Sequence, residues 1–406
     1  MIVVIGAGAA GLMAAIFAAG GPRPVLVIER TRDGGRKILI SGGGRCNVLP
    51  SAGAPERFVT DSPAHLLRGI LRSWPLVQQR AFFESDLDVP LALEADTGKL
   101  FPVSNRARDV RDALIARARA LGVAFQFDTA FVGLEHAGDQ WSVATSRGTI
   151  AAARVVLATG GLSVPLTGSD GGGLNIAAAL GHRVHAPYPA LTPLVAESAS
   201  HAALSGISLN VRLRARVGAR TREAHGGFLF THRGYSGPAV LDVSHVAVRS
   251  RERGGDPAIV RVQWASPDAR GWQSILTGSS GNVATAISAH IPQRLTTALL
   301  AEARVPLDRR LTDLRRDERT AIVERLTSYV LPWTSDEGFR KAEVTGGGIA
   351  LDDVNPQTLE STRHAGLFLC GEMLDAFGPI GGHNFAWAWA TGRLAGLGAR
   401  GDLARP

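Results

Sequence analysis

The first residues of the chain combine a glycine-rich turn with a later acid, a pairing that can bind a pyrophosphate and a ribose. The apolar run 2–5 leads into the pattern G-x-G-x-x-G at Gly6, Gly8 and Gly11, and a second apolar run ends at Glu29. This spacing predicts a strand, a tight turn, a helix and a second strand. Free N–H groups at the helix start bind phosphate, and the acid accepts hydrogen bonds from ribose hydroxyls. We therefore expect a bound dinucleotide.

Four further glycine-rich segments accompany this fingerprint, at 35–47, 158–161, 343–349 and 366–384. The segment 35–47 follows the ribose acid, and its N–H groups and basic side chains suit a pyrophosphate or an electron-rich ring. In the last segment an apolar strand ends in Gly371-Glu372, which suits an acid that binds a ribityl hydroxyl. A helix that starts after Gly382 suits the N1/C2=O edge of a flavin, where negative charge develops on reduction.

Three side chains are candidates for proton transfer: His383, Tyr235 and His232. His383 can donate to a reduced flavin or protonate a substrate carbon, or it can simply contact a backbone carbonyl at the helix entry. Tyr235 is a candidate proton donor, and His232 with Arg233 is a candidate for polarising a carbonyl. The alternative for this second group is a turn that fixes an inserted domain on the cofactor domain.

Two other residues, Cys46 and Asp375, each have two possible roles. Cys46 is expected as a small buried residue beside the cofactor rather than as a nucleophile. Asp375 either holds a ribityl hydroxyl or caps a turn. The two cysteines, Cys46 and Cys370, lie far apart without a C-x-x-C motif, which excludes a redox dithiol and a zinc ribbon and fits a reducing cytoplasm. We expect no metal site.

The charge balance allows a nucleic-acid partner. The net charge is +8 and the sequence pI is about 10.4. Only three of the 44 basic residues are lysine and the others are arginine, so part of the high pI reflects the use of arginine in place of lysine. Arg212, Arg214 and Arg216 alternate with apolar residues and predict a half-buried strand with three arginines on one face. Such a face either tracks a phosphate backbone or is simply solvated. No apolar stretch is long enough to span a bilayer, so we expect no membrane partner.

The elements that position these residues suggest one nucleotide-binding domain built from both ends of the chain. Residues 62–86 and 105–121 are predicted as helices, and 123–132, 140–146, 148–150 and 154–157 as strands. Residues 1–186 and 341–406 are predicted to form the cofactor domain, and 187–340 an insert. The insert is expected to be rich in short strands at 187–265 and helical at 284–335.

Several of these motifs together resemble one bacterial flavoprotein family. The motifs are S-G-G-G-R-C-N at 41–47, F-x-T-H-x-G-x-S-G-P at 230–238, V-T-G-G-G at 344–348 and the glycine-rich run 371–384. They resemble the BaiN/YhiN-like, or HI0933-like, family of NAD(P)/FAD-dependent flavoproteins within the glutathione-reductase-like superfamily. The resemblance implies an α/β fold in which a Rossmann-like FAD-binding domain, built from both chain ends, carries an inserted β-barrel-like and helical domain.

The resemblance also implies a non-covalent FAD and reduction of an activated C=C bond. No second dinucleotide fingerprint occurs in the sequence, so NAD(P)H is expected to dock transiently as the reductant. Two alternatives stay open: a flavin-dependent reductase of a nucleobase in RNA, and a non-enzymatic flavin-binding or redox-sensing protein. The predicted substrate is a small molecule, and the predicted location is cytoplasmic.

The predicted cofactor-binding residues are Gly6, Gly8, Ala9, Ala10, Gly11, Glu29, Arg30, Arg36, Lys37, Ser41, Gly42, Gly43, Gly44, Arg45, Cys46, Asn47, Ala158, Thr159, Gly160, Gly161, Gly371, Glu372, Asp375, Gly381, Gly382, His383, Asn384 and Phe385.

Overall fold

The computed structural model describes residues 1–401 except 198, 253, 255 and 278–279. The chain divides into two compact units. Unit 1 contains Met1–Tyr188 and the chain from Glu343 onward, and unit 2 contains Pro189–Ala342. The borders predicted from the sequence, after residues 186 and 340, each lie two residues from these.

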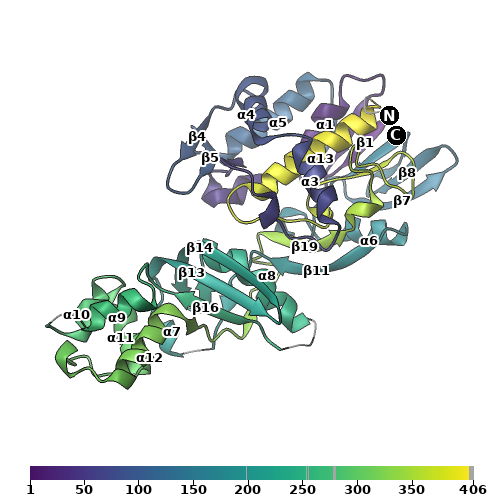
Figure 1. Ribbon diagram of the computed structural model, residues 1–406. Coiled ribbons are helices and arrows are strands. Elements are labelled where there is room, and N and C mark those ends of the chain that lie inside the picture. The colour runs from purple at the N-terminus through teal and green to yellow at the C-terminus, as the bar shows by residue number, and fades with distance from the viewer. Residues whose placement is uncertain (198, 253, 255, 278–279, 402–406) are drawn as a thin grey trace. The chain divides into compact units, whose positions relative to one another are not determined.

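The centre of unit 1 is a five-stranded parallel sheet in the order β20, β10, β1, β2, β6, of which Figure 1 labels β1. These strands are β20 (Leu367–Leu369), β10 (Arg154–Leu157), β1 (Ile2–Ile5), β2 (Val25–Ile28) and β6 (Ala124–Gln126). All four residues of β1 are buried, as expected for a parallel strand that is covered on both faces. The predicted Rossmann-like α/β fold is confirmed.

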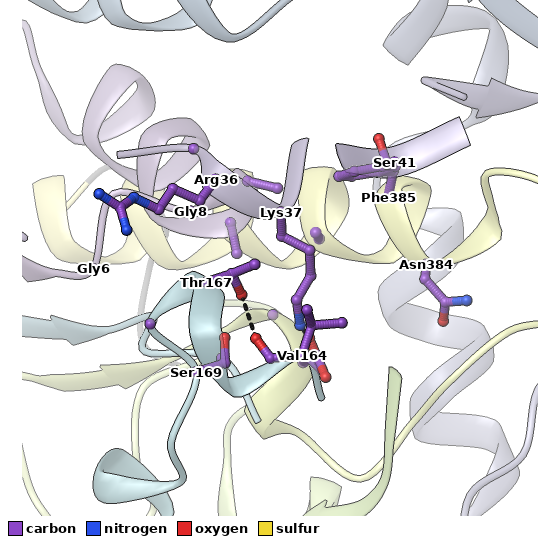
Figure 2. A pocket seen from close by; sticks show the side chains of 18 of the residues that line it. Gly6, Gly8, Arg36, Lys37, Ser41, Val164, Thr167, Ser169, Asn384 and Phe385 are labelled. Carbon is purple, nitrogen blue, oxygen red and sulfur yellow. Dashed lines mark hydrogen bonds and ion pairs between the residues drawn. The ribbon is translucent and has the colours of Figure 1, made fainter. Parts of the chain in front are cut away.

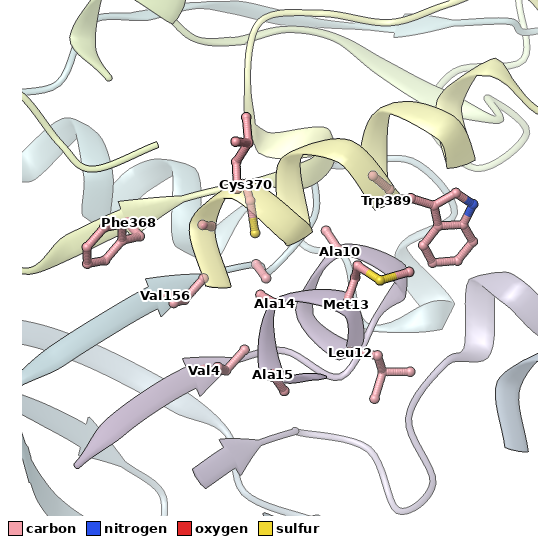
Figure 3. Packing of buried hydrophobic residues seen from close by; sticks show 14 of the residues in the cluster. Val4, Ala10, Leu12, Met13, Ala14, Ala15, Val156, Phe368, Cys370 and Trp389 are labelled. Atoms are coloured by element: carbon pink, nitrogen blue, oxygen red, sulfur yellow. The ribbon is translucent and has the colours of Figure 1, made fainter. Parts of the chain in front are cut away.

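The first and last helices of unit 1 pack directly on each other. These are α1 (Ala9–Ala18) and α13 (His383–Arg400). A Cβ at Gly392 would lie 2.4 Å from the Ala10 carbonyl oxygen, and one at Gly396 would lie 2.4 Å from that of Ala14. Only glycine permits this approach, so the two ends of the chain share one core (Figure 3).

Smaller elements complete unit 1. Its other helices are α2 (Arg36–Ile40), α3 (Ala64–Arg72), α4 (Leu76–Ala81), α5 (Ala107–Ala120) and α6 (Gly172–Ala179). Its other strands are β3 (Leu49–Pro50), β4 (Leu91–Glu94), β5 (Lys99–Pro102), β7 (Phe131–Ala137), β8 (Gln140–Thr145), β9 (Gly148–Ala152), β11 (Val184–Ala190) and β19 (Val344–Ile349). The predicted helix at 62–86 is therefore two helices, α3 and α4, separated at Pro75.

Unit 2 combines a seven-stranded sheet with helices. The strand order is β17 (Tyr329–Val330), β16 (Ile259–Gln263), β13 (Ser208–Val217), β14 (Arg220–Thr231), β15 (Gly234–Ser236), β12 (Leu194–Val195) and β18 (Ser335–Asp336). Its helices are α7 (Ala199–Ala202), α8 (Pro238–Glu252), α9 (Ala269–Thr277), α10 (Val283–Ser288), α11 (Gln293–Glu302) and α12 (Arg316–Thr327).

Helix α8 is an exception within 187–265, the range predicted to be rich in short strands. Its buried residues Val240, Val243 and Ala247 recur at helical spacing and join the hydrophobic core of unit 2. The valines favour a strand by local propensity, but packing against β13 and β14 selects the helix.

No helix among the described residues is long and apolar enough to cross a membrane.

Candidate cofactor site

A cavity of about 640 Å³ opens within unit 1, in the size range of small-molecule and cofactor sites (Figure 2). It is lined by the fingerprint turn, by the ends of β2 and β10, by α2 and the loop after it, by Glu343 and Val344, and by the segment that leads into α13. The five glycine-rich segments of the sequence therefore meet at one cavity.

The fingerprint turn is shaped by two close contacts and one open space. A Cβ at Gly11 would lie 1.9 Å from the Gly6 carbonyl oxygen, and one at Gly6 would lie 2.6 Å from that of Ala158. A Cβ at Gly8 would meet no atom within 4 Å, although Gly8 lines the cavity. Gly6 and Gly11 thus close the turn, while Gly8 leaves room for a ligand at the start of α1.

Glu29 lies at the cavity directly after β2. Its Oε2 accepts a hydrogen bond from the Ala7 N–H (2.7 Å), and its Oε1 accepts from the N–H and the hydroxyl of Thr31 (both 2.8 Å). These donors hold the carboxylate in place beside the fingerprint turn, where it can accept ribose hydroxyls.

Glu372 lies at the cavity shortly after β20 and gathers donors from three other segments. Its Oε2 accepts from Lys37 Nζ (2.6 Å), and its Oε1 accepts from the N–H and the hydroxyl of Thr345 (both 2.9 Å) and from the Ser163 hydroxyl. Lys37 also donates to Ser163 Oγ (2.7 Å). The network places a lysine and a carboxylate together on the cavity wall (Figure 2 shows Lys37).

The loop after α2 supplies much of the lining. Gly42 and Gly43 both have left-handed backbone angles (φ 56° and 68°). Ser41, Gly42, Gly43, Arg45 and Asn47 line the cavity, whereas Gly44 and Cys46 do not. Burial raises the pKa of the Cys46 thiol to about 12, so it is a neutral packing residue at physiological pH.

Asp375 does not line the cavity. Its Oδ2 accepts from Thr60 Oγ1 (3.0 Å), Asp61 N (2.9 Å), Ser62 N (2.8 Å) and Ser62 Oγ (2.7 Å). Of the two sequence-based alternatives, this geometry favours the one in which Asp375 organises a turn. Burial raises the pKa of Asp375, and the Ser62 hydroxyl and His185 oppose that rise.

His383 begins α13 but does not line the cavity. Its ring lies 6.0 Å from the Phe58 ring, centroid to centroid, in an edge-to-face arrangement. Burial, with a contribution from Arg57, lowers the pKa of His383 to about 4. A neutral, packed imidazole favours a positioning role for His383 over proton transfer.

This burial predicts a pH dependence of stability. The unfolded imidazole takes up a proton near its ordinary pKa of 6.5, whereas the folded one does so near 4. Between these two pH values the unfolded state therefore binds more protons than the folded state. As the pH falls through this range, the free energy of unfolding decreases by up to about 3 kcal/mol. We expect His383→Gln to lose less stability than the wild type between pH 7 and pH 4 in chemical denaturation. Parallel stability curves for the two proteins would contradict this assignment.

The other two proton-transfer candidates lie in unit 2. Tyr235 is fully buried in the hydrophobic core of that unit, and its hydroxyl is hydrogen-bonded to His201 Nδ1. Burial raises its pKa far above the ordinary value. His232 is exposed, and its Nδ1 lies 3.2 Å from the Ser205 hydroxyl. The burial of Tyr235 favours a packing role.

Most predicted cofactor residues line the cavity, and six do not. These six are Gly11, Gly44, Cys46, Gly161, Asp375 and His383. Gly161 is close to the cavity wall, since a Cβ there would lie 3.1 Å from Oε1 of Glu372, which lines the cavity.

Sequence reasoning missed three parts of the lining, and one of them is the segment 129–131 after β6. Lys99 and Phe101 of β5 line the cavity, and the Arg45 guanidinium lies 3.9 Å from the centre of the Phe101 ring. The loop that contains Val164 and Asp170 also lines it, and Asp170 forms an ion pair with Arg30. The glycines around Asp170 are the only sequence signal that marks this loop.

The cavity fits a dinucleotide such as FAD. Two of its carboxylates, Glu29 and Glu372, follow two different strands of the sheet and suit hydroxyls at separate parts of a long ligand. The open space at Gly8 suits a pyrophosphate at the start of α1.

Known proteins resemble the chain over nearly its whole length. The chain matches the family described as HI0933-like protein Rossmann domain over residues 1–398. It is 30% identical over 398 residues to the ribosomal RNA dihydrouridine synthase of Escherichia coli, covering 96% of this chain and 95% of that one. It is 29% identical over 406 residues to the 3-dehydro-bile acid delta(4,6)-reductase of Clostridium scindens, covering 98% of both chains.

Solved structures show the same fold. The 3-ketosteroid-delta4-(5alpha)-dehydrogenase of Rhodococcus jostii is 16% identical with a TM-score of 0.51, covering 98% of this chain and 96% of that one. A mutant of the E. coli quinol fumarate reductase FrdA also has 16% identity and a TM-score of 0.51, covering 98% of this chain and 69% of that one. At this identity the likeness concerns the fold alone.

Proposed function

The chain belongs to the HI0933-like family of FAD-dependent oxidoreductases, and we propose that it uses NAD(P)H to reduce an activated C=C bond of its substrate. The observation that carries the proposal is the convergence of all five glycine-rich segments on one cavity. Bound FAD supplies hydride transfer to an electron-poor double bond. The names of two relatives agree with this reaction class, since dihydrouridine is uridine with two added hydrogens and the other relative is named a reductase.

The chain's own residues would hold and shield the cofactor. The start of α1 at Gly8 would bind the pyrophosphate, Glu29 a ribose, and Glu372 the ribityl chain. Lys37 lies against Glu372 (2.6 Å) and would keep that carboxylate oriented. The two cysteines are free and buried, which supports a cytoplasmic location.

The test is anaerobic mixing of the FAD-loaded protein with NADH and with NADPH, followed by the oxidised-flavin absorbance. We expect one of them to bleach the flavin rapidly. The reduced protein is then offered a conjugated 3-keto steroid acid and a uridine-containing RNA, and reoxidation identifies the acceptor. Tight FAD without bleaching by either nucleotide would contradict the proposed donor and favour a redox-sensing protein.

A further inference from the structure

The net positive charge of the chain is concentrated in unit 2. Residues 189–342 contain 21 of the 44 lysines and arginines but 14 of the 36 acids, a net charge of +7, whereas the rest of the chain has a net charge of +1. The cofactor cavity lies in unit 1, so this charge is not needed to hold the cofactor.

Part of this charge lies on one face of the unit 2 sheet. Along β13 the apolar residues Val211, Leu213 and Ala215 are buried, while Arg212, Arg214 and Arg216 are exposed, which confirms the predicted alternation. The half-buried Arg261 of the neighbouring strand β16 pairs with Arg214 and lies on the same face. We call these four arginines the arginine face.

The opposite face of these strands forms the core of unit 2. Leu213 of β13 and Val262 of β16 are buried there with Val243 of α8. Helix α8 contacts both β13 and β14 (Figure 1). The helix therefore covers the apolar face and leaves the β13 arginines exposed.

The arginines of the arginine face repel one another, and residues on the adjacent strands neutralise this charge only in part. Arg214 and Arg261 lie directly opposite each other, an arrangement that destabilises a sheet. Glu223 of β14 pairs with Arg214 (Nε to Oε1, 2.7 Å). Arg212 and Arg216 lie opposite His225 and Thr221 in the same register, so neither faces an acid across that pair of strands.

We propose that the arginine face binds the phosphate backbone of RNA. Alternate residues of a strand lie about 7 Å apart, which lets successive arginines contact successive phosphates of an extended strand. Helix α12 differs, because its arginines are interspersed with Asp317, Glu318 and Glu324. This inference rests on the proposed function in one respect: a base of the bound RNA would contain the C=C bond that the enzyme reduces.

The test measures binding of a short fluorescein-labelled single-stranded RNA to the full-length FAD-loaded protein across a range of salt concentrations. The variant is R212Q/R214Q/R216Q. The control R270Q/R310Q/R316Q removes the same charge from exposed positions of unit 2 outside the sheet. Because each neutralised phosphate contributes about 0.7 to the slope of log affinity against log salt, we expect the variant's slope to be shallower by roughly 2. The control should keep the wild-type slope.

Equal loss in both triple variants would overturn the proposal, because it would show that binding depends on net charge alone. An unchanged slope in the sheet variant would overturn it as well. Binding to anionic vesicles that exceeds RNA binding and depends on the same arginines would assign the face to a membrane instead. Flavin bleaching by NAD(P)H is measured on the same samples, so failure of the proposed reductase activity is seen separately.

Discussion

Replacing Gly8 with valine is expected to abolish FAD binding while the protein stays folded. Gly8 has φ −80° and ψ −173°, which valine adopts without strain. A Cβ there meets no protein atom within 4 Å, and the residue lines the cavity. The added side chain would occupy the space through which the backbone approaches a pyrophosphate. We expect FAD affinity to fall at least roughly a hundredfold, about 3 kcal/mol.

The measurement is a titration of the apoprotein with FAD, followed by flavin fluorescence, together with the melting temperature of the apoprotein. Gly11→Val is the matched control, since its Cβ would lie 1.9 Å from the Gly6 carbonyl oxygen. That variant should lose folding as well as binding. Normal FAD affinity in Gly8→Val would show that the pyrophosphate does not pass over this turn.

Replacing Asp375 with alanine is expected to destabilise unit 1 by about 3 kcal/mol or more. The substitution leaves Asp61 N, Ser62 N and the Ser62 hydroxyl without this acceptor. A buried donor without a partner costs about 1–3 kcal/mol. Chemical denaturation at neutral pH measures the effect.

Asp375→Asn retains one acceptor oxygen and should lose about half as much stability. Asp308→Ala removes an exposed acid in unit 2 and should change stability by less than about 0.5 kcal/mol. Equal stability of Asp375→Ala and the wild type would mean that the turn at 60–62 forms without this carboxylate.

The cofactor site was largely predictable because its signals are local. The turn at Gly6, Gly8 and Gly11 and the acid Glu29 follow from spacing within one strand–helix–strand unit. Lys99 was not predictable in this way, because it reaches the cavity through the pairing of β5 with β3, where Lys99 lies opposite Pro50. The register between short strands that are far apart in the chain cannot be predicted from a single sequence.

The roles of adjacent residues were the least predictable part. Glu372 and Asp375 are three residues apart, yet one lines the cavity and the other binds the turn at 60–62. His383 and Asn384 are neighbours, yet of the two Asn384 alone lines the cavity. The 3-10 turn at 371–373 and the first turn of α13 set the directions in which these four side chains point. Both turns depend on packing rather than on residue type.

The packing of α13 on α1 has a consequence for how the protein is made. Strand β1 and helix α1 are synthesised long before Asn384, Phe385 and Trp387, which complete the cavity wall. Until α13 emerges from the ribosome, the glycine-lined contact that buries one side of α1 cannot form, and that apolar side stays open to other chains. The completed cavity, and with it capture of the cofactor, therefore follows synthesis of α13.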